Sequence, residues 1–274
     1  MNEHVVVLTE LVEFLRRLAP LELAEEWDNV GLLVGDSQAS VRSVMTCLTL
    51  TPEVAEEAVT EQADLIVSHH PVLFRATKRL TADEPEGATL LKLIRAGIAV
   101  YSPHTSYDSC REGINQQLAE WFGLEEIEPL RVLPCEEEAE ETTGRPVGIG
   151  RCGRLPEPTP LAELVQTVKQ VLNVARLWYV GDGAQVVERL GIACGAAAEF
   201  AKDALAKGCD VFLTGEARFH SCLEAKALGL AMILPGHYAT ERPAVERLAE
   251  RLAQQFPGLK VWASRAEQDP LRWA

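Results

Sequence analysis

Apolar residues recur along the chain with two different periods, which predicts alternating helices and strands. Residues 8–18 carry leucine or valine at every third or fourth position, the pattern of an amphipathic helix. Short apolar runs of three or four residues, each close behind a helical segment, are typical of buried strands. The expected helices are 8–18, 52–62, 88–96, 197–207, 220–228 and 243–255, and the expected strands are 65–67, 98–101, 211–214, 231–234 and 260–263.

The second half of the chain repeats the first. Val34-Gly-Asp36 matches Val180-Gly-Asp182, and residues 63–68 match 209–214 at the same offset of 146 positions. Later matches have a shorter offset, so the first half holds about 14 extra residues around 74–88. We therefore predict two similar α/β units, each with helices on both faces of its sheet.

The predicted division of the chain follows this repeat and the local composition. We place the first α/β unit at residues 1–134 and the second at residues 147–274. Residues 135–146 form an acidic linker, in which five glutamates occupy six consecutive positions. Such a run has little to bury and is usually a solvated surface.

Histidine and acidic residues follow several of the predicted strands. Three short segments, which begin at His69, His104 and His237, come directly after an apolar run. The carboxyl ends of parallel strands meet at one edge of a sheet, where α/β proteins bind ligands. The residues expected at such an edge are His69, His70, His104, Asp108, His237 and Glu241.

These side chains have the chemistry of a metal site. A lone histidine at a strand end is more often a hydrogen-bonded structural residue, but three equivalent strand ends are hard to explain that way. His237 and Glu241 are four positions apart, so on a helix their side chains converge. Imidazole and carboxylate suit Zn, Fe, Mn, Co or Ni, and this many ligands fit two divalent ions about 3.5–4 Å apart.

Charge and cysteine content narrow the function classes. The chain has 26 Lys and Arg against 41 Asp and Glu, a net charge of −15, which disfavours nucleic acid and anionic membranes as partners. The seven cysteines form no C-x-x-C pair, as expected for reduced thiols in a cytoplasmic protein. Neither a leader segment nor a membrane-spanning segment is expected, because no apolar run approaches about 20 residues.

Several motifs together resemble a known family. They are Glu26-Trp-Asp-Asn-Val-Gly31, Ser68-His-His-Pro71, His104-Thr105 with Asp108, Thr214-Gly-Glu216, and Gly236-His-Tyr-Ala-Thr-Glu241. The chain resembles the NIF-three-like dinuclear-metal proteins, often labelled GTP cyclohydrolase I type 2 homologs. The resemblance implies a duplicated three-layer α/β/α sandwich that assembles as a homohexamer. It also implies a two-metal site between the two units, with Glu241 as the bridging ligand and His69, His70, Asp108 and His237 as the others.

The leading functional hypothesis is metal-dependent hydrolysis of a small molecule, and the family label suggests opening of the guanine ring of GTP. His104 is the candidate for proton transfer and Glu241 for bridging the ions, with Glu216 and His220 as pocket residues. Two alternatives remain: a nucleotide or phosphodiester phosphohydrolase, and a non-catalytic protein for metal binding, metal delivery or scaffolding. Asp28 is expected to form a turn. Trp27 could pack on a base, but it is expected in the core, where tryptophan is found more often.

Overall fold

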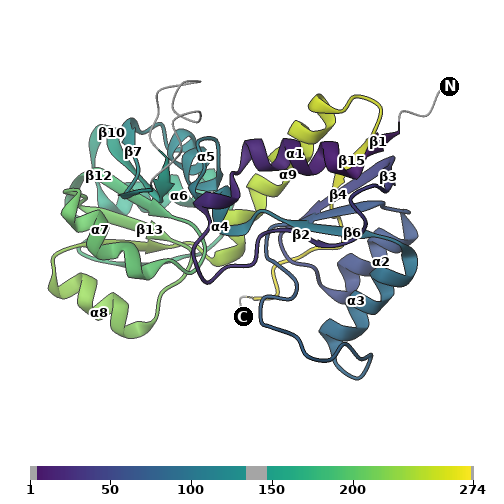
Figure 1. The fold of residues 1–274 in the computed structure, drawn as a ribbon. Coiled ribbons are helices and arrows are strands. Elements are labelled where there is room, and N and C mark those ends of the chain that lie inside the picture. The colour runs from purple at the N-terminus through teal and green to yellow at the C-terminus, as the bar shows by residue number, and fades with distance from the viewer. Residues whose placement is uncertain (1–4, 134–146, 273–274) are drawn as a thin grey trace. The chain divides into compact units, whose positions relative to one another are not determined.

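The computed structural model describes residues 5–133 and 147–272, which form two compact units (Figure 1). Unit 1 contains the described residues up to 107 and those from 242 onward, and unit 2 contains those from 108 to 241. Each unit is built around one sheet with helices packed on it, so the predicted α/β class is confirmed. In the described part of the chain, no helix combines the length and the apolar character needed to cross a membrane.

The sheet of unit 1 has five strands. Their order is β15 (Lys260–Ala263), β4 (Ser43–Cys47), β5 (Leu65–Ser68), β6 (Ala99–Ser102) and β2 (Gly31–Val34). The first four strands are parallel and β2 runs antiparallel to β6. The central strands β4, β5 and β6 are buried along their whole length, which explains why their short sequences are mostly apolar.

Helices cover both faces of this sheet. Helices α2 (Pro52–Thr60) and α3 (Pro85–Ala96) share one core cluster with β4, β5 and β6. On the opposite face lie α1 (Leu8–Leu18) and the later turns of α9 (His237–Gln255). There the Thr46 hydroxyl of β4 donates to the Val245 carbonyl of α9 at 2.9 Å. The smaller elements are β1 (Val6–Val7), which pairs with β3 (Ser40–Val41), the 3₁₀ turn η1 (Leu21–Leu23), and α4 (His104–Ser109).

The sheet of unit 2 has six strands. Their order is β11 (Trp178–Val180), β14 (Ala231–Leu234), β13 (Val211–Thr214), β12 (Val186–Ala193), β10 (Arg151–Pro160) and β7 (Glu125–Glu128). Strands β12, β13 and β14 are parallel, and β7, β10 and β11 pair antiparallel with their neighbours. The other elements are α5 (Ile114–Trp121), α6 (Leu161–Val171), α7 (Ala201–Ala206), α8 (Phe219–Ala227), η3 (Ala198–Phe200) and the pair β8 (Arg131–Val132) and β9 (Gly148–Ile149).

Four strands of unit 1 have counterparts of the same order and direction in unit 2. They are β2, β4, β5 and β6, which match β11, β12, β13 and β14. Gly35 and Gly181 follow the matching edge strands and both have φ of +129°, and a Cβ on either would crowd an alanine of the neighbouring strand. Asp64 and Asp210 each accept two consecutive backbone N–H groups through one carboxylate oxygen. This agreement down to single residues supports the duplication that the sequence predicts.

The compact units do not follow the predicted boundaries at 134 and 147. Strand β15 pairs with β4, so the C-terminal segment belongs to unit 1. Strand β7 pairs with β10 and β8 pairs with β9, so the chain already belongs to unit 2 from residue 108. Backbone pairing places both segments, and a sequence repeat does not reveal it. The acidic linker 135–146 lies outside the described residues.

Candidate functional site

Three histidines meet at the carboxyl ends of two neighbouring strands of unit 1. His69 and His70 follow β5 directly, and His104 begins α4 just after β6. One ligand atom from each of the three side chains lies within 4.8 Å of the others, a spacing that could hold a metal ion. Their ring centroids are 5.2–5.6 Å apart. We call His69, His70 and His104 the histidine group; it joins the predicted proton-transfer residue His104 to two predicted ligands.

The backbone at the end of β5 explains how two adjacent histidines can face one place. Their N–H groups donate to carbonyls at the end of β4, at 2.9 and 2.8 Å, so the ladder continues past the strand. The Ser68 hydroxyl donates to the His70 carbonyl at 2.8 Å, and the Ser102 hydroxyl donates to the His69 carbonyl at 2.7 Å. These two buried serines hold the turn before Pro71, and only 2% of His69 is exposed.

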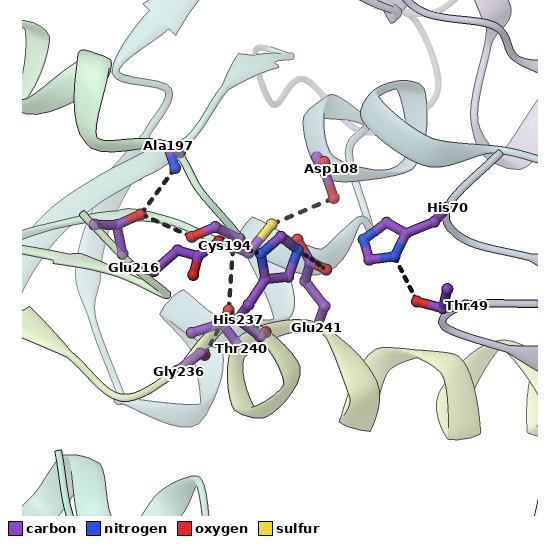
Figure 2. Close-up of polar contacts among 12 residues, drawn as sticks. Thr49, His70, Asp108, Cys194, Ala197, Glu216, Gly236, His237, Thr240 and Glu241 are labelled. Atoms are coloured by element: carbon purple, nitrogen blue, oxygen red, sulfur yellow. Dashed lines mark hydrogen bonds and ion pairs between the residues drawn. The ribbon is translucent and has the colours of Figure 1, made fainter. Parts of the chain in front are cut away.

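Two of these imidazoles are oriented through their Nδ1 atoms. Thr49 Oγ1 lies 2.7 Å from His70 Nδ1 (Figure 2). Asp28 Oδ1 lies 2.7 Å from His104 Nδ1. When Nδ1 carries the proton toward such an oxygen, Nε2 is the basic nitrogen, which is the usual arrangement of a histidine that binds a metal or accepts a proton.

Asp28 does more than form the predicted turn. Its carboxylate is fully buried and also accepts the Thr105 N–H at 3.1 Å and the Thr105 hydroxyl. Burial raises the pKa of Asp28, but hydrogen bonds from His104, Thr105 and Asn29, with the charge of His104, outweigh it and lower the pKa overall. Asp28 therefore stays ionised and holds His104. Its place in the Glu26–Gly31 motif was the sequence signal for this role.

A second set of side chains gathers in unit 2, at the start of α9. The helix begins at His237 and not at the predicted Pro243, so His237 and Glu241 lie on consecutive turns. His237 Nε2 is 3.0 Å from Glu241 Oε2, and Nδ1 is 3.0 Å from Glu216 Oε1 (Figure 2). The hydrogen bond to Glu241, with support from Glu216 and against the effect of burial, raises the pKa of His237 to about 9.

Asp108 joins this set through a cysteine that the sequence analysis missed. The Cys194 thiol donates to Asp108 Oδ1 at 3.3 Å (Figure 2). The Cys194 N–H donates to Asn115 Oδ1 at 2.8 Å. Burial and the charges of Asp108 and Glu241 raise the pKa of Cys194 well above its usual value, so the thiol keeps its proton. Cys194 follows β12 and had only its strand-end position as a signal. We call Asp108, Glu216, His237 and Glu241 the acidic group.

Two glycines make space for the acidic group. Gly195 has φ of +66°, and a Cβ there would lie 2.2 Å from Glu241 Oε1 and 3.4 Å from His237 Nε2. A Cβ on Gly215 would lie 2.6 Å from the Gly195 carbonyl oxygen and 2.8 Å from His237 Cα. Real Cβ atoms do not approach this closely, so the positions of His237 and Glu241 depend on both glycines.

The two predicted pocket residues have different surroundings. Glu216 contacts His237 and also lines a cavity of about 700 Å³ within unit 2. The remaining lining residues are Ala196, Ala198, Glu199, Ala217, Arg218 and Ser221. His220 lies exposed on α8, with its ring 5.9 Å from that of Phe219. Glu216 therefore connects the cavity to His237, and Arg218 supplies a positive charge in the cavity.

Each unit thus collects the predicted site residues that it contains. Imidazole nitrogens and carboxylate oxygens are the donors that borderline divalent transition metals prefer. Carboxylates at the Nδ1 atoms of His104 and His237 match the outer partners that metal-binding histidines usually have. The space left by Gly195 for the Glu241 carboxylate also suits a ligand oxygen. The residues present therefore fit metal ions.

Comparison with known proteins identifies the family of this chain. Residues 6–270 match the Duf34/NIF3 (NGG1p interacting factor 3) family. A Clostridium perfringens protein named "GTP cyclohydrolase 1 type 2 homolog" is 31% identical over 97% of this chain and 99% of its own. The "NGG1-interacting factor 3" of Saccharomyces cerevisiae is 31% identical over 96% of each chain.

Solved structures show the same fold. A Bacillus cereus protein related to NIF3 covers 98% of this chain and 99% of its own with a TM-score of 0.88 at 23% identity. Reduced HcgD from Methanocaldococcus jannaschii covers 96% of this chain and 99% of its own with a TM-score of 0.80 at 26% identity. Sequence and fold agree over nearly the whole length, and the chain belongs to the Duf34/NIF3 family.

Proposed function

We propose that this chain is a metal-dependent hydrolase of a small molecule. Two divalent transition-metal ions would be held by the five predicted ligands His69, His70, Asp108, His237 and Glu241, with Glu241 as the bridge. The observation that carries the proposal is the histidine group, whose ligand atoms lie within 4.8 Å of one another at the strand ends of unit 1. The relatives' name makes opening of the guanine ring of GTP the first reaction to test.

The chain's own residues supply the remaining chemistry. Paired metal ions in proteins lower the pKa of bound water and polarise carbonyl or phosphoryl oxygens. His104 is placed to move a proton, because the buried Asp28 carboxylate contacts its Nδ1 atom and orients its ring. Thr49 and Glu216 hold the rings of His70 and His237 in the same way. These contacts keep the imidazoles in place before any substrate arrives.

We propose a nucleotide-sized substrate and a homo-oligomeric assembly, a hexamer by resemblance to the family. A chain with a net charge of −15 repels a free triphosphate, so positive charge must be supplied locally. Arg218 in the cavity beside Glu216 is one such charge. Sedimentation of the full chain tests the assembly, and a monomer would contradict it.

Metal content is the first test. Protein purified without chelator should contain two transition-metal ions per chain by elemental analysis. His69→Ala should lower the content by at least one ion, because it removes the imidazole of a proposed ligand that is 2% exposed. His220→Ala is the matched control, since His220 is exposed on α8, and it should leave the content unchanged. One ion or none in reconstituted wild-type protein would count against the five-ligand assignment.

Turnover of GTP is the second test. Metal-loaded protein should release formate, and His69→Ala should lose this activity. Release of phosphate instead would favour phosphoester hydrolysis, which paired metals also support. Equal residual activity in wild type and variant would overturn the hydrolase proposal. Exchangeable metal without turnover of any substrate would favour metal binding or delivery.

A further inference from the structure

Unit 1 carries two exposed aromatic rings next to the histidine group. Trp27 was expected in the core, but that prediction is wrong: 58% of Trp27 is exposed, because it lies in the loop between η1 and β2. Phe74 is 47% exposed. The centroids of the two rings are 5.8 Å apart, edge to face, and lie 6.0 and 6.4 Å from the His104 ring. We call Trp27 and Phe74 the aromatic shelf.

A hydrogen bond joins the two loops that carry the shelf. Trp27 directly precedes Asp28, whose carboxylate is bonded to His104. The Asn29 amide donates to the Leu73 carbonyl at 3.0 Å, which ties the loop of Trp27 to the loop of Phe74. Neighbouring polar residues therefore orient His104 and hold together the two loops that carry the aromatic rings.

Two residues beside the shelf have strained backbones. Leu73 has φ of +56° and His104 has φ of +25°, although neither is a glycine. Such conformations cost about 1–2 kcal/mol each and are kept mainly where a site needs them. The turn at Leu73 is also held by Glu86, which accepts the Leu73 N–H at 3.2 Å. The chain accepts this strain and leaves Phe74 facing outward, although burial of a phenyl ring would stabilise the fold by about 1.5–3 kcal/mol.

We propose that the aromatic shelf binds a planar heteroaromatic ring of the substrate and presents its edge to the histidine group. This inference rests on the proposed function and names the substrate class of the same site. An aliphatic group would pack on the shelf but would leave the His104 ring next to apolar surface. A heteroaromatic ring offers an apolar face for stacking and nitrogen or oxygen atoms at its edge for hydrogen bonds.

Binding of guanosine to the full-length protein tests the shelf, with ribose 5-phosphate as the probe that lacks a ring system of this kind. Stacking on an aromatic side chain contributes about 1–3 kcal/mol per base, so Trp27→Ala should raise the Kd of guanosine by about tenfold. Phe74→Ala should act in the same direction, and Trp27→Phe should recover most of the affinity. Isothermal titration calorimetry measures each Kd, and circular dichroism confirms that the variants are folded.

Trp178→Ala is the matched control, because Trp178 is 68% exposed but lies on β11 of unit 2. It should leave the Kd of guanosine unchanged. The shelf is overturned if guanosine does not bind, if Trp27→Ala binds it as tightly as wild type, if Trp178→Ala weakens it equally, or if ribose 5-phosphate binds as tightly as guanosine.

The same measurements separate the shelf from the proposed function. Each titration is run on metal-loaded and on chelated protein, and metal content is determined in parallel. If the protein takes up no metal but guanosine binding still depends on Trp27, the metal proposal fails and the shelf stands. If metal content is normal and Trp27→Ala has no effect, the shelf fails and the metal proposal stands.

Discussion

The sheets of the two units end in the same way but carry different chemistry. Leu65 and Val211 hold the same position in the two sheets, since each pairs in parallel with the first residue of the next strand. Counted from them, His69 of unit 1 matches Gly215 of unit 2, and His70 matches Glu216. One sheet thus ends in imidazole nitrogens, and the other ends in carboxylates around a single imidazole.

Local space explains part of this difference. The Gly215 position cannot hold a histidine, because even a Cβ would lie 2.8 Å from His237 Cα. In unit 1 the matching position has room for the His69 ring. The centroid of this ring lies 6.5 Å from that of the Tyr107 ring. A repeated fold therefore provides the positions, and the loops that follow the strands decide which side chains fit there. Three substitutions and the pH dependence of stability test how far the two sheet ends differ.

Gly195→Ala should have the largest effect, because it fills the space of the Glu241 carboxylate. A non-glycine residue at φ of +66° costs about 1–2 kcal/mol, and the 2.2 Å contact adds to that, so we expect a loss of more than about 2 kcal/mol with loss of metal. Urea denaturation and metal analysis measure both. Gly229→Ala is the control. Gly229 has φ of +77°, and a Cβ there would have no described heavy atom within 4 Å apart from its neighbours in the chain.

Gly229→Ala should lose only about 1–2 kcal/mol of stability, the cost of a left-handed backbone conformation in alanine, and it should keep its metal. Equal losses in the two variants would show that Gly195 matters only for backbone conformation. The end of the unit 2 sheet would then tolerate side chains as freely as that of unit 1.

Asp28→Asn should have the next largest effect. The Asp28 side chain is fully buried and the Glu216 side chain is 56% exposed, although both accept the Nδ1 proton of an imidazole. Loss of a buried charged hydrogen bond costs about 1–3 kcal/mol, and loss of an exposed one costs much less. Asp28→Asn should therefore destabilise the protein clearly more than Glu216→Gln, and it should reduce turnover without reducing metal content.

Chemical denaturation of both variants checks the order of stability. Loss of metal from Asp28→Asn would contradict the assignment of His104 to proton transfer and would favour a ligand role for it.

Thr49→Val should lower the affinity for metal and leave the stability of the fold unchanged. It removes the hydroxyl 2.7 Å from His70 Nδ1 while keeping the shape of the side chain. Loss of such an outer partner typically weakens metal affinity by about tenfold or more. Competition with a chelator of known affinity measures this. Thr77→Val is a suitable control, because the Thr77 hydroxyl only donates to the nearby Arg75 carbonyl, and it should leave the affinity unchanged.

The pH dependence of the metal-free protein should show the smallest effect. The pKa of His237 rises from 6.5 to about 9 on folding, so its stabilisation is complete below pH 6.5 and lost as pH rises through 9. The pKa of Asp28 is lowered below 3.8, so its stabilisation is complete above pH 3.8 and lost as pH falls further. The free energy of unfolding should therefore fall at alkaline pH, where His237 of the acidic group loses its proton. It should also fall at acid pH, where Asp28 beside the histidine group becomes protonated.

Denaturation of chelated protein across this range checks both signs. His237→Gln should remove the alkaline loss and leave the acid one. Partial exposure of His237 keeps the alkaline effect small, since solvent screens its ion pairs. A stability that rises between pH 6.5 and 9 would contradict the assignment.

Much of the site was predictable because it depends on local patterns. The apolar runs before His69 and His104 predicted strand ends, and the four-residue spacing predicted that His237 and Glu241 converge. Partners from distant segments were not predictable. Asp28 and His104 are 76 positions apart, and Thr49 and His70 are 21 apart, and nothing in the sequence pairs them.

The sequence by itself determined the α/β class, the repeat and the strand ends that carry chemistry, because hydrophobic period and residue type are local properties. Only the tertiary structure decided which segments complete each sheet, why Gly195 and Gly215 must be small, and that Trp27 stays exposed. Those features depend on backbone pairing and on the space between atoms far apart in the chain, and a one-dimensional pattern does not encode them directly.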